Sequence, residues 1–154
     1  MRIAILEPDI PQNTGTILRL AACLGVPVDL IAPAAFDMSE RAFRRAGLDY
    51  LDHVSLTRHA SLGAFLDASR SAGRRIVLLT THGAVAHTSV AYAVSDTLLV
   101  GRESAGAPPE AHAAADVRVR IPMRAGLRSL NVAVALAIVL GESMRQTGGF
   151  GGFE

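Results

Sequence analysis

Short apolar runs alternate along the chain with segments whose apolar residues recur at helical spacing. The apolar runs at residues 2–6, 26–32, 50–54, 75–80, 97–100 and 117–121 predict strands. The helical pattern predicts helices at 14–24, 39–46, 61–72 and 129–146, with N-caps at Thr14, Ser39, Ser61 and Ser129. Strands separated by helices indicate an α/β fold with a mainly parallel sheet and helices on both faces.

The last predicted helix is unusual because residues 132–140 are apolar on every side. A helix with that pattern is buried all round, whereas the last helix of a small domain normally faces solvent on one side. We therefore expect its second face to meet another subunit. A central core helix is the alternative. The glycine-rich tail at 147–154 is expected to be mobile.

The 154 residues predict a single domain, 1–154. One cysteine, Cys23, excludes an internal disulfide and favours a reducing cytoplasm. Its apolar helical context predicts a thiol packed in the core. The longest apolar run is too short to span a bilayer, so no membrane partner is expected.

The net charge of +1 does not indicate a particular class of binding partner, and all 15 basic residues are Arg. Arg41, Arg44 and Arg45 share one face of the helix predicted at 39–46. A polyanion would relieve their repulsion, but so would the acidic residues near them in the sequence. The five histidines have neither the spacing nor the partners of a metal site, so no metal is expected.

Three loops follow predicted strands, at the edge of a parallel sheet where ligands bind. In the first, Asn13 and Gly15 stand where a helix begins, and Arg19 follows one turn later. The start of a helix offers free N–H groups to an anion. Taken alone, this loop is more typical of an ordinary turn.

The second loop holds Glu103 between Gly101 and Gly106, whose lack of a side chain would let a ligand approach the backbone. The loop has neither the lysine of a phosphate-binding loop nor the spacing of a dinucleotide site. The third loop runs from Ile121 to Asn131. An Asn in the first turn of a helix is unexpected unless its side chain has a partner.

Together the loops resemble the SPOUT class of RNA methyltransferases. The first matches its N-x-G-x-x-x-R motif and the second its G-x-E-x-x-G motif. The third matches the I-P-M…S-L-N motif through Ile121, Pro122, Met123, Ser129, Leu130 and Asn131. Residues 7–15, 44–50 and 79–81 are similar to the minimal tRNA (cytidine/uridine-2'-O)-methyltransferases of this class.

The resemblance implies a C-terminal trefoil knot that holds S-adenosylmethionine, with S-adenosylhomocysteine as product. The implied cofactor contacts are Leu79, Gly101, Ile121, Met123, Ser129 and Leu130. It also implies a homodimer through the C-terminal helix, and a tRNA substrate methylated on the ribose of the wobble nucleotide, a cytidine or modified uridine of leucine tRNAs. Arg41, Arg44 and Arg45 are then the candidate RNA contacts.

The implied catalytic residues are Arg19, Asn13, Glu103 and Asn131. Arg19 is expected to anchor a phosphate and stabilise the emerging alkoxide, because a guanidinium is hard to deprotonate. Two positions depart from the pattern of relatives: Ala133 replaces a frequent serine, and Gly141 stands where a tyrosine can occur. A non-catalytic RNA-binding relative, an enzyme of this class acting on another RNA, and an unrelated nucleotide-binding domain are the alternatives.

Overall fold

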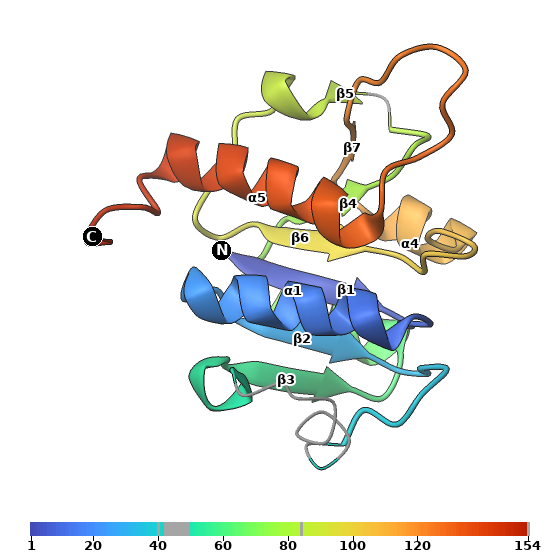
Figure 1. The fold of residues 1–154 in the computed structure, drawn as a ribbon, viewed down its shortest axis with the longest axis vertical. Helices are drawn as coiled ribbons and strands as arrows, with labels where there is room; N and C mark the ends of the chain where they lie inside the picture. The colour runs from blue at the N-terminus through green and yellow to red at the C-terminus, as the bar shows by residue number, and fades with distance from the viewer. Residues whose placement is uncertain (40, 42–49, 84, 154) are drawn as a thin grey trace.

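A parallel sheet organises the molecule (Figure 1). The structure, a computed structural model, describes residues 1–39, 41, 50–83 and 85–153. The described strands pair in the order β3-β2-β1-β6-β4-β7-β5, and every neighbouring pair is parallel. Their bounds are β1 (Arg2–Leu6), β2 (Val28–Ile31), β3 (Leu56–His59), β4 (Ile76–Leu79), β5 (Val85–Ala86), β6 (Thr97–Val100) and β7 (Val117–Arg120).

Helices cover both faces of the sheet, as predicted. Helices α1 (Pro11–Cys23) and α5 (Val132–Thr147) lie side by side on one face, and α3 (Leu62–Ser71) and α4 (Pro109–Ala114) lie on the other (Figure 1). Alternate residues of β1 divide the core accordingly. Ile3 and Ile5 pack with the α1–α5 side, whereas Ala4 and Leu6 pack with Phe65 of α3.

Two of the predicted N-caps are wrong. Thr14 lies inside α1, which begins at Pro11 and has no side-chain cap. A proline at the first helical position removes an N–H that would have no partner there. Ser129 precedes α5, whose N-cap is Asn131. The predicted cap Ser61 is confirmed, since its hydroxyl accepts from Ala64 N at 3.2 Å.

The predicted strand at 50–54 is also wrong. A 3-10 turn, Leu51–His53, occupies that position, and the strand lies later, at Leu56–His59. The short elements β5 and α4 were not predicted, because two and six residues are too few to show a period. The helix predicted at 39–46 falls mainly outside the described residues. The crossing of the chain that a knot requires stays a prediction.

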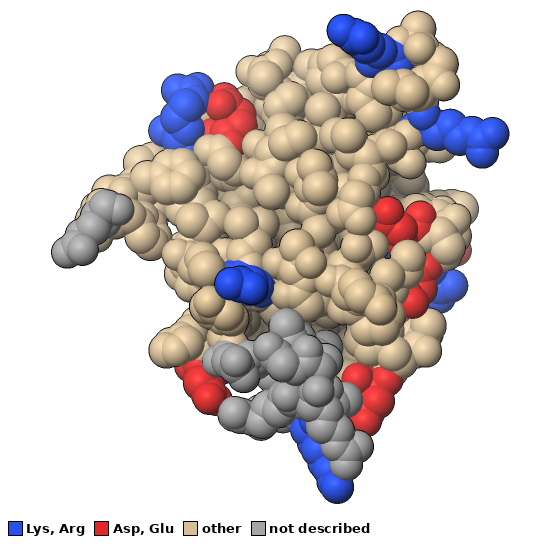
Figure 2. Space-filling view, in the orientation of Figure 1, with Lys and Arg blue, Asp and Glu red and all other residues tan. Residues whose placement is uncertain are grey.

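The core position predicted for Cys23 is wrong, because Cys23 is exposed near the end of α1. Helix α5 buries one face, through Leu136, Val139 and Leu140, and exposes the other. The surface over the middle of α5 carries no charged side chain (Figure 2). No described helix is long and apolar enough to cross a membrane.

Candidate functional site

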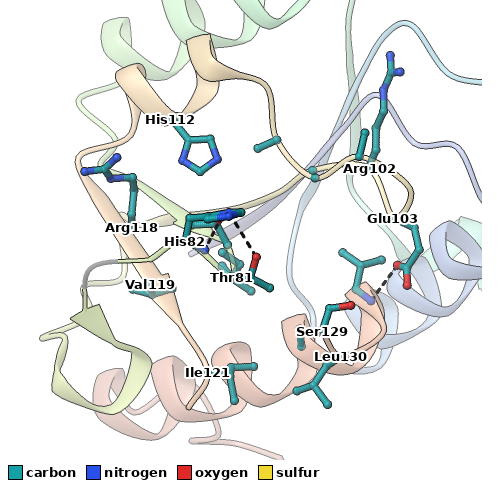
Figure 3. A pocket seen from close by; sticks show the side chains of 18 of the residues that line it. Thr81, His82, Arg102, Glu103, His112, Arg118, Val119, Ile121, Ser129 and Leu130 are labelled. Atoms are coloured by element: carbon teal, nitrogen blue, oxygen red, sulfur yellow. Dashed lines mark hydrogen bonds between the residues drawn. The ribbon is translucent and has the colours of Figure 1, made fainter. Parts of the chain in front are cut away.

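A cavity of about 920 Å³ opens at the carboxyl ends of β4, β6 and β7. The loop after each of these strands forms part of its wall (Figure 3). All six residues predicted to contact the cofactor line it: Leu79, Gly101, Ile121, Met123, Ser129 and Leu130. The tertiary structure therefore brings together residues that span more than fifty positions of the sequence.

The lining is mostly apolar, with a few polar groups. Val119, Val132, Ala135 and Val139 add to the apolar wall, while Thr81, His82, Glu103 and His112 bring polar atoms. His82 and His112 lie on one side and Ser129 and Leu130 on the other (Figure 3). Such a surface suits an organic ligand that has a flat apolar ring and a few polar substituents. In the part of the chain that the structure describes, no group of His, Cys, Asp and Glu is arranged to hold a metal ion.

Gly101 and Gly106 shape the loop after β6, which folds back on itself. The N–H groups of Arg102 and Gly106 donate to each other's carbonyl oxygens at 3.1 and 2.9 Å. A Cβ on Gly101 would lie 2.4 Å from Ala107 N, and Gly106 has a φ of +69°. The loop's own backbone therefore requires glycine at 101, and the close approach of a ligand to this backbone stays a prediction.

Glu103 joins the three sequence motifs. Its Oε2 accepts from Asn13 Nδ2 at 3.1 Å and from Val132 N, at the start of α5, at 2.9 Å. Asn131 Nδ2 donates to Asn13 Oδ1 at 2.9 Å. The other amide oxygen of this network, Asn131 Oδ1, accepts from the N–H groups of Ala133 and Val134. Three of the four predicted catalytic residues thus form one hydrogen-bond network beside the cavity, and Asn131 has the partners it needed.

Asp9 belongs to the same region and was not predicted. Its carboxylate accepts from Glu103 N and Ser104 N, each at 3.1 Å, and also from the Ser104 hydroxyl. Burial favours a higher pKa for Asp9, but these hydrogen bonds outweigh it and lower the pKa below the ordinary value of 3.8. The only signal in the sequence was a carboxylate in the first loop, and nothing local indicated its partner.

Glu7 and Arg102 form a second unpredicted link between the first two loops, an ion pair between Glu7 Oε2 and Arg102 Nη2. Both partners are partly buried, so solvent screens the pair less than an exposed one. With Asp9, this pair fastens the loop after β1 to the loop after β6.

Arg19, the fourth predicted catalytic residue, does not line the cavity. It lies six residues beyond Asn13 along α1, which is about 9 Å of helix. Its Nη2 donates to the Tyr50 hydroxyl at 3.2 Å, and its guanidinium carbon lies 4.7 Å from the Tyr50 ring centroid. Of the predicted RNA contacts, Arg41 is exposed, and Arg44 and Arg45 lie outside the described residues.

Residues 1–141 match the SpoU rRNA Methylase family. The chain is 53% identical over 150 residues to the tRNA (cytidine(34)-2'-O)-methyltransferase of Ancylobacter novellus, covering 97% of this chain and 95% of that one. It is 40% identical over 150 residues to the protein of that name in Escherichia coli (strain K12), covering 96% and 94%.

Two solved structures extend the similarity to the fold. One, described as "Structural insights into the 2-OH methylation of C/U34 on tRNA", has a TM-score of 0.87 and 40% identity, with 94% of each chain covered. The other is the SpoU methyltransferase AviRb from Streptomyces viridochromogenes in complex with AdoMet. It has a TM-score of 0.82 and 29% identity, and the match covers 95% of this chain and 60% of that one.

Proposed function

The chain belongs to the SpoU rRNA methylase family, and we propose that it methylates the ribose 2'-hydroxyl of the wobble nucleotide in tRNA. The target is cytidine or a modified uridine, in leucine tRNAs. The observation that carries the proposal is the network at Glu103, which joins all three sequence motifs beside a cavity of cofactor size.

The cavity suits S-adenosylmethionine. Its apolar walls, with Leu79, Ile121 and Leu130 among them, can enclose an adenine ring, and backbone groups near Gly101 and Ser129 are available for polar substituents. When bound, the cofactor supplies a methyl group already activated by a sulfonium centre. The protein's task is therefore mainly to position the ribose hydroxyl and exclude competing nucleophiles.

The network residues hold that geometry. Glu103 is fixed by Asn13 and by the start of α5, so its carboxylate keeps one orientation beside the cavity (Figure 3). Asn131 links the α5 cap to the same network. Arg19 binds a phosphate of the substrate and stabilises negative charge that develops on the ribose oxygen, without losing its own proton.

We further propose a homodimer through α5, in which Arg19 of one subunit serves the cavity of the other. Two observations support it. Val134 and Ile138 are 49% and 39% exposed on a face of α5 that carries no charge in its middle. Arg19 lies away from the cavity of its own chain, on α1, which packs beside α5. A cytoplasmic tRNA is the partner, with Arg41, Arg44 and Arg45 as additional RNA contacts.

The deciding experiment is a methylation assay on total tRNA with labelled S-adenosylmethionine, followed by mapping of the modified nucleotide. The expected result is ribose methylation at the wobble position of leucine tRNAs. Methylation at another position would support an enzyme of the same family with a different target. Cofactor binding without transfer to any RNA would contradict the proposed activity, and absence of cofactor binding would favour a non-catalytic RNA-binding protein.

A further inference from the structure

Most arginines in the described part of the chain have a partner. Arg2 pairs with Asp29, Arg75 with Asp96, and Arg145 with Glu142. Even the exposed Arg70 on α3 forms an ion pair with Asp67. Arg118, Arg124 and Arg128 differ, since no hydrogen bond or ion pair joins their guanidinium groups to any described residue, and all three are exposed.

These three arginines lie around the mouth of the cavity. Arg118, on β7, and Arg128, just before α5, both line it, and Arg124 lies on the loop between them. Basic side chains project from the molecule where Figure 1 shows this loop, and no acidic side chain of that view lies against them (Figure 2). We define Arg118, Arg124 and Arg128 as the cationic rim.

The loop that carries two of the rim residues, Arg124 and Arg128, is free to adapt to a ligand. Residues 122–130 are all exposed, and one backbone hydrogen bond within it, Leu127 N to Arg124 O at 3.3 Å, is the only one formed among them. Long arginine side chains on such a loop can reach a ligand at the mouth without disturbing the core.

The chemistry of the rim indicates a polyanion. The cofactor offers one carboxylate, balanced by its own positive charges, so it does not account for three unpaired guanidinium groups. A ribose-phosphate backbone carries one negative charge per nucleotide, and arginine binds phosphate through paired N–H donors. The phosphates next to a target ribose must pass this mouth if its hydroxyl is to reach the cavity.

We propose that the cationic rim binds the phosphates flanking the target nucleotide, an inference that rests on the proposed function. The rim is separate from Arg41, Arg44 and Arg45, which lie in another part of the sequence. Each arginine that contacts a phosphate displaces counterions, so it contributes about 0.7–0.9 to the slope of log affinity against log salt.

The test measures binding of a fluorescently labelled leucine tRNA transcript by anisotropy at several salt concentrations. Replacing all three rim arginines with Ala should weaken binding about 10- to 100-fold near 0.15 M salt and reduce the slope by about two to three. Arg124→Ala alone should reduce the slope by about one, whereas the matched control Arg70→Ala on α3 should leave it unchanged.

Titration calorimetry with S-adenosylmethionine on the same variants shows whether the rim binds RNA or the cofactor. It also reports whether each variant is folded. Unchanged cofactor affinity together with a shallower salt slope supports the rim. If the triple variant binds tRNA with the wild-type slope, the proposal is wrong. It is equally wrong if Arg118→Ala and Arg128→Ala weaken only cofactor binding, because the rim then serves the cofactor carboxylate. A rim-dependent slope in a protein that methylates no tRNA would support the rim and contradict the proposed function.

Discussion

Asp9 fastens the loop that carries Glu103, although it lies more than ninety positions earlier in the chain. Its carboxylate accepts hydrogen bonds from two backbone N–H groups and one hydroxyl, and these bonds restrict the motion of the loop after β6. Glu103 can keep one orientation only if its own backbone is held. Asp9 is therefore a positioning residue that acts through Glu103.

Asp9→Ala should weaken S-adenosylmethionine binding about tenfold, since hydrogen bonds to a charged group contribute about 1.5 kcal/mol. Titration calorimetry measures the change. Asp9→Asn keeps one acceptor oxygen and should lie between wild type and Asp9→Ala. The matched control Asp67→Ala, on α3 and away from the cavity, should bind like wild type. An unchanged affinity in Asp9→Ala would show that the loop keeps its shape without this carboxylate.

The lowered pKa of Asp9 gives this contribution a pH dependence. The folded state favours the charged carboxylate, so the stabilisation is complete above about pH 5 and is lost as pH falls through the lowered pKa. The difference in free energy of unfolding between wild type and Asp9→Ala should therefore shrink on acidification below about pH 4. Denaturant unfolding at several pH values measures it.

Among the elements, α5 combines a buried face with an exposed apolar one. Leu136 and Leu140 are fully buried, whereas Val134 and Ile138 are not. Gly141 follows on the same side, and a Cβ there would have no described atom within 4 Å apart from its adjacent residues and the nearby backbone of α5. Relatives can carry a tyrosine at this position, so the glycine of this chain leaves open space, which a second α5 can fill.

Ile138→Glu should dissociate the proposed dimer, because a carboxylate buried in an apolar interface without a partner costs about 3 kcal/mol or more, over a hundredfold in Kd. Sedimentation equilibrium should give two chains of 16.2 kDa for wild type and one for the variant. Ala68→Glu, at an exposed position of α3, is the matched control and should remain dimeric. A monomeric wild-type protein would rule out this interface.

For the whole molecule, the main consequence is that one chain does not hold all four predicted catalytic residues together. Asn13, Glu103 and Asn131 form a single network, while Arg19 faces Tyr50. A symmetric dimer repeats both features, so each cavity can be completed by the arginine of the other subunit.

Mixed dimers test this arrangement. Arg19→Ala and Glu103→Ala homodimers should each fail to transfer methyl groups. After subunit exchange, a mixed dimer contains one intact site, so random mixing should restore about a quarter of wild-type activity. Circular dichroism of each homodimer reports folding. If mixing restores no activity although mixed dimers form, Arg19 acts within its own subunit.

The sequence alone determined the class of fold and the three loops that meet at the cavity. Strands 2–6 and 97–100 were predicted at their observed bounds, because their apolar runs are buried and continuous. The three motifs could also be recognised in the sequence, because glycine, asparagine and proline at fixed spacing indicate a turn or the start of a helix. Caps and short elements were less predictable. Thr14 and Ser129 have the right chemistry for a cap, yet α1 begins at Pro11 and the N-cap of α5 is Asn131.

Only the tertiary structure decided which distant residues meet. The links of Asp9 to Ser104 and of Glu7 to Arg102 join loops that parallel pairing of β1 with β6 brings to one edge of the sheet. No local pattern records such a pairing, because each carboxylate is equally compatible with solvent. The exposure of Cys23 and the unpaired guanidinium of Arg118 could not be predicted for the same reason. Burial and pairing depend on neighbours that are brought close by the fold and not by the adjacent sequence.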